Sequence, residues 1–386
     1  MAENQGTDAD RPAPRPAAAW GVVAVMVYLL LVAVGVVGDG FRLAVGGQAG
    51  AERLFAFATN PFVGVLLGTL TTALVQSSST VTSIIVGLVA GGLPVGVAIP
   101  MVMGANMGTT VTNTLVSLGH IGRADEFKRA FAAATVHDWF NLLGIVIFLP
   151  IEVAFGLIER ASAALLTAFV SVGSYSTGGW DLLGRTVGPG RSLAGALGDP
   201  LPETGGGVLL IGLGVVLILV SITYLGRALK TVMVGNARRL LHAAIGRGAG
   251  AGILSGTVVT VLVQSSSTTT SLMVPLAAGG VFALREVYPF TLGANIGTTI
   301  TALMAATAVT GASREPALQI ALAHFLFNAF AVTVVYGVPW LRRLPLRGAG
   351  WIAELGAERK GLALAYVLAV FFAIPALLTV ATLRLF

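Results

Sequence analysis

The chain has 386 residues, of which 55% are hydrophobic and 10% are charged, and its mean hydropathy is +0.88. This composition excludes a soluble globular protein and indicates a helical protein that crosses the membrane several times. The chain contains no cysteine, which excludes disulfides and thiolate metal sites. Its formal net charge is +6, but the basic residues lie in short loops between apolar segments, where they orient membrane proteins. We therefore expect a lipid bilayer, and no nucleic acid, as a partner.

A polar stretch precedes the first apolar segment. Residues 1–19 are proline-rich and predict a disordered cytoplasmic arm. Residues 20–37 are long enough for a first membrane-spanning helix, so we expect no removable signal peptide. Further apolar segments follow at residues 60–92, 94–118, 128–150, 205–225, 250–284, 287–309, 316–341 and 362–384.

The regions between these segments predict orientation. Residues 226–248 contain five basic residues and no acid, which predicts a cytoplasmic loop. Residues 173–204 contain acids as well as bases and predict an outward loop. The segment 155–173 is interrupted by Glu159 and Arg160, so it either spans the membrane or lies along its interface as an amphipathic helix.

The sequence contains an internal repeat. The polar tract Gln-Ser-Ser-Ser-Thr occurs at residues 76–80 and again at residues 264–268. The block Gly-Ala-Asn-x-Gly-Thr-Thr at residues 104–110 returns at residues 293–299. His137 and Asn141 return as His324 and Asn328, and all these matches are separated by 187 to 189 residues. Three matching blocks in the same order indicate two colinear halves.

The charges of two loops indicate that the halves are inverted. Residues 39–59 carry balanced charges, whereas the corresponding loop of the second half is strongly basic. The two loops therefore face opposite sides of the membrane. We predict an all-α polytopic membrane protein with two inverted repeats, the architecture of many secondary transporters. The expected organisation is an arm (1–19), a first repeat (20–153), a connector with an outward loop (154–204), a second repeat (205–341) and a C-terminal loop and helix (342–386).

The stretches 60–92 and 250–284 are too long for one membrane span and contain the polar tract midway. Each is predicted to form a re-entrant helical hairpin with Gln-Ser-Ser-Ser near its tip, although two spans joined by a short turn are an alternative. Hydroxyls and amides are costly in hydrocarbon unless they line an enclosed or watery site. The duplicated tract therefore predicts one binding site that is built from two related elements.

The residue types in this region define its chemistry. Residues 54–122 contain no Asp, Glu, Lys or Arg but many hydroxyls and amides. Hydroxyls and exposed N–H groups at a helix N-terminus bind oxyanions, whereas carbonyl, hydroxyl and amide oxygens suit sodium. Together they favour coupled symport over a simple pore. Gly104 and Gly108 allow an unwound backbone with close approach, or else simple helix packing.

Asp138 lies within an apolar helix, where an ionisable group is usually functional. Its counterpart in the second half is Phe325, so a cation site or charge-compensating group would exist in one half only. A structural carboxylate that bonds a neighbouring hydroxyl is the alternative. His137 and His324 are interpreted as satisfied interior histidines, because nothing pairs them with catalytic partners.

Several motifs resemble those of the type II sodium-dependent phosphate cotransporters. They are the duplicated Gln-Ser-Ser-Ser-Thr, the Gly-Ala-Asn-x-Gly-Thr blocks and the run from Phe127 to Asp138. The resemblance covers roughly residues 57–153 and 250–339 and implies sodium-driven phosphate uptake. The run Ala132-Ala-Ala-Thr-Val-His-Asp138 is similar to the pattern that supports an additional sodium ion in electrogenic members. The outward loop lacks cysteines and Asn-x-Ser/Thr sites, as fits a bacterial member in the inner membrane.

The expected site residues follow from the motifs and the resemblance together. For phosphate we expect Gln76, Ser77, Ser78, Ser79, Gln264, Ser265, Ser266, Ser267, Asn106, Asn295 and Arg123. For sodium we expect Thr80, Thr109, Thr110, Asp138, Gln264, Ser265, Thr298 and Thr299. Sodium is the coupling ion, and no cofactor is expected.

The predicted mechanism is alternating access with an elevator-like motion, which the resemblance implies. Three sodium ions with one divalent phosphate would carry one net positive charge inward. A symporter for sulfate or another oxyanion is the first alternative. A membrane phosphatase for lipid pyrophosphate is the second, but the hairpins lack the clustered acids, arginine and base that such an enzyme needs. We therefore expect no enzyme.

Overall fold

The computed structural model describes residues 16–46, 50, 60–172, 177–244 and 247–385, with their side chains except those of 16–17, 169–172, 177–184, 230–244 and 383–385. These described residues form helices and short turns without any β-strand. Six helical segments are long and apolar enough to cross a membrane: Ala18–Val45, Val95–Leu118, Ala124–Phe155, Glu203–Leu229, Gly311–Tyr336 and Lys360–Thr382. The chain is an all-α, multi-pass membrane protein, as its composition predicts.

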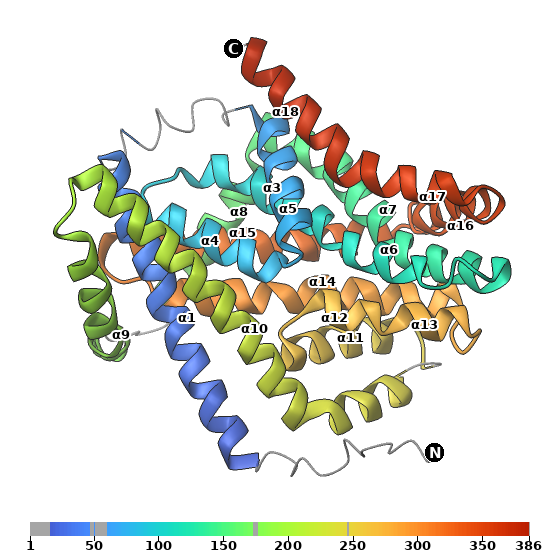
Figure 1. Cartoon of the computed structure of the whole chain (residues 1–386), viewed down its shortest axis with the longest axis horizontal. Coiled ribbons are helices and arrows are strands. Elements are labelled where there is room, and N and C mark those ends of the chain that lie inside the picture. The colour runs from blue at the N-terminus through green and yellow to red at the C-terminus, as the bar shows by residue number, and fades with distance from the viewer. Residues whose placement is uncertain (1–15, 47–49, 51–59, 173–176, 245–246, 386) are drawn as a thin grey trace, which may run out of the picture.

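The first half begins with α1 (Pro16–Val45), which packs along α10 of the second half (Figure 1). Two short helices, α3 (Pro61–Val75) and α4 (Ser78–Gly91), follow and hold the first polar tract at their junction. The half continues with α5 (Val95–Thr109), α6 (Val111–Leu118) and α7 (Ala124–Phe155). Then come α8 (Leu157–Val172) and α9 (Thr177–Gly198).

The second half repeats this order of elements. It begins with α10 (Glu203–Ala244) and continues with α11 (Ala249–Val263), α12 (Ser266–Ser271) and α13 (Met273–Ala278). Pro275 lacks an N–H and would clash with the carbonyl four residues earlier, which accounts for the break between α12 and α13. The half continues with α14 (Leu284–Thr307), the short 3₁₀-helix η3 (Gly311–Ser313), α15 (Arg314–Ala331) and the π-helix η4 (Val332–Tyr336). The chain closes with α16 (Arg343–Glu358), α17 (Lys360–Leu368), η5 (Ala369–Ala373) and α18 (Ile374–Leu385).

Four regions that the sequence predicts as irregular are wholly or partly helical. Helix α1 begins at Pro16, inside the arm predicted to be disordered, whose residues 1–15 lie outside the described part. Helix α10 runs through most of the predicted basic loop, because its Ala, Leu, Lys and Arg residues are good helix formers. Most of the predicted outward loop is α9, and most of the predicted C-terminal loop is α16, which gains stability by packing against α7.

The ambiguous segment 155–173 contains α8, which has 16 residues. A helix of that length extends about 24 Å, less than the roughly 30 Å of a hydrocarbon core. Its sequence is amphipathic, and it packs against α15, α5 and α7. Its length and amphipathic sequence favour the interpretation that α8 lies along the membrane–water interface and does not span the membrane.

Each pair of short helices reverses the chain direction. Gly68 lies against Met101, and Gly108 lies against Thr69, so α3 and α5 run parallel. The same order recurs in α11 and α14, where Gly256 meets Phe290. Because α3 and α5 are parallel, α4 must return the chain to the side from which α3 started. With 15 and 14 residues, α3 and α4 extend about 22 Å each, too short to cross the membrane.

The glycines of the repeated block are helical, so the expected unwinding of the backbone at Gly104 and Gly108 is wrong. A Cβ on Gly104 would lie 2.0 Å from the Val65 carbonyl oxygen, and one on Gly293 would lie 1.9 Å from that of Ile253. The absence of side chains lets the two helix backbones touch. Hydroxyls reinforce the contact, since Thr69 donates to the Gly104 carbonyl at 3.1 Å. Thr257 likewise donates to the Gly293 carbonyl at 3.0 Å.

The two hairpins end at opposite ends of the α5–α6 rod. The end of α4 lies beside the end of α1, where Arg42 donates to the Ala90 carbonyl at 3.0 Å. The end of α13 lies beside the start of α7, where Arg129 donates to the Ala278 carbonyl at 2.6 Å. Because α5 starts just after α4, and α6 ends just before α7, these contacts lie at different ends of the rod. Figure 1 shows α9 at one side of the molecule and α13 and α16 at the other.

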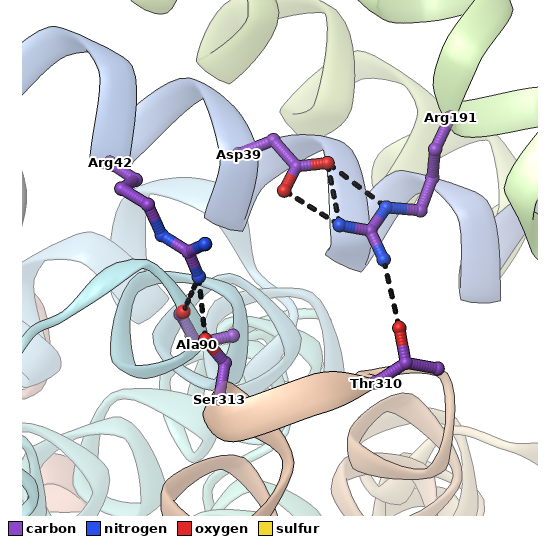
Figure 2. Close-up of polar contacts among 6 residues, drawn as sticks. All are labelled: Asp39, Arg42, Ala90, Arg191, Thr310 and Ser313. Carbon is purple, nitrogen blue, oxygen red and sulfur yellow. Dashed lines mark hydrogen bonds and ion pairs between the residues drawn. The ribbon is translucent and has the colours of Figure 1, made fainter. Parts of the chain in front are cut away.

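A cluster of charged and polar side chains joins several elements on the α9 side (Figure 2). Arg191 of α9 binds both carboxylate oxygens of Asp39 on α1, at 2.6 and 2.7 Å, and donates to the Thr310 hydroxyl at 3.5 Å. Arg42 also donates to the Ser313 hydroxyl at 2.5 Å. We call these five side chains the polar clamp. It connects α1 and α9 to the turn between α14 and α15.

Candidate functional site

Both polar tracts make the same unusual turn. Gln76 has φ 55° and ψ 29°, and Gln264 has φ 55° and ψ 28°. They are the two non-glycine residues with positive φ in the part of the chain that the structure describes. The left-handed conformation costs a side-chain-bearing residue about 1–2 kcal/mol, so its use at two matching glutamines indicates a feature that function requires.

The serine after each glutamine caps the returning helix. The Ser77 hydroxyl accepts from the Thr80 N–H at 3.2 Å, and the Ser265 hydroxyl accepts from the Thr268 N–H at 3.1 Å. A helix leaves its first N–H groups without intrahelical acceptors. At the two tips, those groups belong to the serines that follow the caps. The N–H groups and the positive end of each helix dipole can therefore receive an anion.

The serine side chains at both tips are enclosed by protein. Ser78 and Ser79 are 3% and 4% exposed, and Ser266 and Ser267 are 3% and 8% exposed. The returning helix α4 packs against α14 and α15, while α12 and α13 pack against α6 and α7. Each tip thus lies against helices of the other half and away from lipid.

The two glutamines differ in their surroundings. Gln264 is buried, and its side-chain oxygen accepts from the Thr301 hydroxyl at 2.8 Å. Gln76 is exposed, and the Thr112 hydroxyl, the counterpart of Thr301, is buried without a partner. The pseudo-symmetry of the two halves is therefore broken at the tips.

The asparagines of the repeated block hold the two halves together. Asn106 donates to Asn328 at 2.9 Å and accepts from His324 at 3.0 Å. Asn295 donates to Asn141 at 2.7 Å and its oxygen lies 2.6 Å from His137. The side chains of both asparagines are thus occupied by helices of the other half, although the sequence assigns them to phosphate. In this arrangement Asn106 joins α5 to α15, and Asn295 joins α14 to α7.

The histidines are interior residues, as expected, but only one ring nitrogen of each has a hydrogen-bond partner. The NH₂ group of Asn106 donates to Asn328 and that of Asn295 donates to Asn141, so each of the two presents its oxygen to a histidine. The Nε2 atom of each histidine therefore carries the proton. The Nδ1 atoms of His137 and His324 are buried without hydrogen-bond partners. Neither histidine pairs with an acid, so nothing here forms a general-base arrangement.

Asp138 is almost completely buried, with 1% exposure. One carboxylate oxygen accepts from the Tyr366 hydroxyl at 2.8 Å, and the other has no hydrogen-bond partner. The Thr110 hydroxyl faces the same carboxylate. A buried carboxylate oxygen without a donor suits a bare cation, because an unpaired negative charge inside a membrane protein is otherwise very costly.

Comparison with known proteins gives the family of the chain. The family model described as Na+/Pi-cotransporter matches residues 29–173 and 217–347. The chain belongs to the Na+/Pi-cotransporter family. This confirms the resemblance that the repeated tract indicates.

Two of the relatives are mammalian proteins. The chain is 32% identical to sodium-dependent phosphate transport protein 2A of Rattus norvegicus over 91% of its own length. It is 31% identical to sodium-dependent phosphate transport protein 2B of Homo sapiens over 90% of its own length. It spans 65% and 63% of those two proteins, which is less than two thirds of each. No solved structure matches the chain.

The threonines expected to bind sodium bond atoms of their own helices or helix caps. Thr80 lies 2.8 Å from the Ser77 hydroxyl. Thr109 donates to the Ala105 carbonyl, and Thr298 donates to the Ala294 carbonyl. Thr299 donates to the Ile296 carbonyl at 2.7 Å. Each hydroxyl oxygen keeps lone pairs that can face a cation.

Arg123 lies in a different environment from the tips. Its side chain is 77% exposed and pairs with Glu126 at 2.7 Å in the first turn of α7. This carboxylate raises the pKa of the Arg123 guanidinium. The structure does not bring Arg123 to either serine tract.

Two partners of the site, Asn113 and Tyr366, are not among the site residues expected from the sequence. Asn113 of α6 accepts from Thr270 and Ser271 of α12, both at 2.9 Å. Tyr366 lies in α17, outside the repeat, so comparison of the two halves cannot find it. A single hydroxyl in an apolar helix is its only sequence signal.

Proposed function

We propose that this protein is a sodium-coupled symporter that imports inorganic phosphate. The observation that carries the proposal is the pair of matching tips, each with a left-handed glutamine and a serine-capped helix. Family membership supports the choice of solute, because the relatives bear the name sodium-dependent phosphate transport protein.

The phosphate is held between the two tips by donors rather than by fixed positive charge. Backbone N–H groups at residues 78–79 and 266–267 face the oxyanion, and neighbouring hydroxyls complete its coordination. A site without arginine or lysine binds a divalent anion weakly enough for release once sodium has left. Sodium then supplies the positive charge that makes loading favourable.

One sodium ion binds at Asp138. The unpartnered carboxylate oxygen and the facing Thr110 hydroxyl support this assignment, since hard cations prefer oxygen ligands. The second half has Phe325 at this position, so the ion adds to those held near Thr109, Gln264 and Thr298. We expect three sodium ions per divalent phosphate, which moves one net positive charge inward.

Alternating access follows from two inverted repeats. The hairpins end at opposite ends of the α5–α6 rod, which supports entry from opposite sides of the membrane. The tips differ in exposure at Gln76 and Gln264. Exchange of these two environments, by an elevator-like movement of the repeats, opens the site to the other side.

The test is uptake of radiolabelled phosphate into proteoliposomes that contain the purified full chain. An inward sodium gradient should drive accumulation, an equal potassium gradient should not, and excess sulfate should compete poorly. Uptake that is independent of sodium contradicts the proposed coupling. Effective competition by sulfate reassigns the solute to another oxyanion.

The serine caps give the site-specific part of this test. Ser77→Ala and Ser265→Ala each remove a cap worth about 1 kcal/mol and reorient the N–H groups at a tip, so uptake should fall about tenfold or more. Ser162→Ala is the control, because Ser162 is a buried serine whose hydroxyl bonds the Glu159 carbonyl in α8 and caps neither tip. Equal losses in all three variants would place the effect in folding and not in binding.

A further inference from the structure

A large pocket lies at the start of α14, apart from the serine tracts. It encloses about 880 Å³ and is lined by Arg285, Tyr288, Tyr336, Arg342, Arg343 and Arg347 together with apolar residues. Ligand pockets of this kind range from roughly 300 to 1,000 Å³. From Tyr288 to Thr298, the helix rises about 15 Å along its axis. The pocket is therefore distinct from the two tips.

The lining of the pocket carries four positive charges and no acid. None of the four arginines forms an ion pair within the described ranges. The nearest acid in the sequence is Glu286. Its carboxylate accepts a hydrogen bond from the Ala283 N–H at 2.8 Å. Four guanidinium groups that converge without counter-charges attract anions strongly. Their planar forks match the oxygens of phosphate groups.

One residue that lines the pocket has an unused hydrogen-bond donor. Tyr288 is 1% exposed, and its hydroxyl is buried without a partner. Its ring packs edge-on against Tyr336, with centroids 5.4 Å apart. Arg342 lies over the Tyr336 ring at 5.2 Å, which orients one guanidinium at the edge of the pocket. An anion bound beside Tyr288 would satisfy its hydroxyl.

The position of the pocket is that of a membrane–water interface. Trp340 and Trp351 beside it are 64% and 57% exposed, and such aromatic residues collect at the level of lipid headgroups. Helix α16, which contains Arg343 and Arg347, is amphipathic and covers α7. The excess of basic residues assigns this face to the cytoplasm.

We propose that this pocket is a second anion site, which binds a phosphate-bearing ligand at the cytoplasmic interface. Two sources supply such a ligand: the headgroup of an anionic phospholipid in the inner leaflet, and free phosphate in the cytoplasm. Basic pockets between membrane helices bind phospholipid headgroups through the same contacts. The proposal does not depend on which solute passes between the serine tracts.

The experiment is a calorimetric titration of the full chain in neutral detergent and sodium-free potassium buffer. One arm adds dihexanoyl phosphatidylglycerol, with dihexanoyl phosphatidylcholine as its zwitterionic counterpart. The other arm adds potassium phosphate. Omission of sodium keeps the proposed coupled site unloaded, so heat from this pocket is measured alone. Saturable binding of dihexanoyl phosphatidylglycerol identifies the lipid headgroup as the ligand. Saturable binding of phosphate identifies free phosphate as the ligand.

Two variants connect the binding to the pocket. The double variant Arg342→Gln/Arg343→Gln should lower the affinity for the anion about tenfold or more, because it removes two charge-assisted contacts. Tyr288→Phe keeps the ring but removes the hydroxyl, and should lower the affinity for the anion about threefold or more. Arg359→Gln/Lys360→Gln removes the same charge at the other end of α16 and should change little. Size-exclusion profiles that match the wild type show that each variant is folded.

The proposal fails if neither dihexanoyl phosphatidylglycerol nor phosphate binds saturably to the wild-type chain. It also fails if binding is unchanged in both Arg342→Gln/Arg343→Gln and Tyr288→Phe while these variants remain folded. Sodium-driven uptake is measured separately in phosphatidylcholine liposomes, so loss of the proposed transport function would be recognised independently.

Discussion

Single residues carry unusual conformations and charges at the center of this protein. Gln76 and Gln264 hold left-handed backbones that glycine would adopt at less cost. The glutamine side chain must therefore have a purpose, which for Gln264 is its bond to Thr301. Asp138 is the other exceptional residue, because its carboxylate is buried with one oxygen unpaired.

Replacement of Asp138 tests the proposed additional sodium. Asp138→Asn removes the charge but keeps the shape, so one sodium ion should be lost from each cycle. At an inside-negative potential of about 100 mV, the wild type gains about 2.3 kcal/mol of driving free energy per net charge. The variant should lose that gain, and its uptake should no longer respond to a valinomycin-imposed potential.

The control for this variant is Asp125→Asn. Asp125 lies in the first turn of the same helix but is exposed, so its replacement should leave the sodium-to-phosphate flux ratio unchanged. Tyr366→Phe removes the hydroxyl that bonds Asp138 and should lower sodium affinity without changing the flux ratio. An unchanged ratio in Asp138→Asn would refute the assigned role.

At the scale of elements, glycine determines how the helices meet. The parallel pairs α3–α5 and α11–α14 touch through their backbones, and these contacts fix where each serine tip lies. Glycine usually weakens a helix by about 1 kcal/mol relative to alanine. Here the loss is offset by the close approach of two helices and by hydroxyl-to-carbonyl bonds such as that from Thr257.

One methyl group on this contact should be destabilising. In Gly293→Ala the new Cβ would lie 1.9 Å from the Ile253 carbonyl oxygen, so the helices must separate, which costs about 1–3 kcal/mol. The apparent Tm of the detergent-solubilised protein should fall. Gly212→Ala in α10 is the matched control, because nothing lies within 4 Å of its new Cβ. An equal Tm for the two variants would contradict this explanation.

At the scale of the whole molecule, polar contacts between the halves hold one conformation. The buried asparagine–histidine contacts lie between helices of opposite halves, and the polar clamp lies on the α9 side (Figure 2). Movement of one half against the other requires contacts between the halves, such as the polar clamp, to break. The clamp is partly exposed, so it contributes about 1 kcal/mol or less, which suits a contact that forms and breaks.

Loss of the clamp should shift the balance of conformations. Arg191→Gln breaks the bonds to Asp39 and Thr310, and a change of about 1 kcal/mol alters populations about fivefold. Because the chain lacks cysteine, single cysteines report accessibility cleanly. In the Arg191→Gln background, Gln76→Cys should react more slowly with a maleimide, and Gln264→Cys should react faster.

The comparison variant is Arg123→Gln. It breaks an ion pair that lies within one turn of α7 and joins no separate elements, so both labelling rates should stay as in the wild type. If Arg191→Gln also leaves both rates unchanged, the clamp does not stabilise this conformation.

The order of amino acids was sufficient to predict the helical membrane class, the family and a turn at each repeated tract. Those features depend on local composition and on residues close together in the chain, such as Gln264 and Ser265. Which side chains bond one another was decided by the tertiary structure, because that depends on which helices, distant in sequence, become neighbours. Asn106 and Asn295 therefore bond the opposite half where the motif suggested a ligand, and Tyr366 reaches Asp138 across 228 residues of sequence. The four arginines of the second pocket converge for the same reason, since folding brings Arg285 to the loop that contains Arg342.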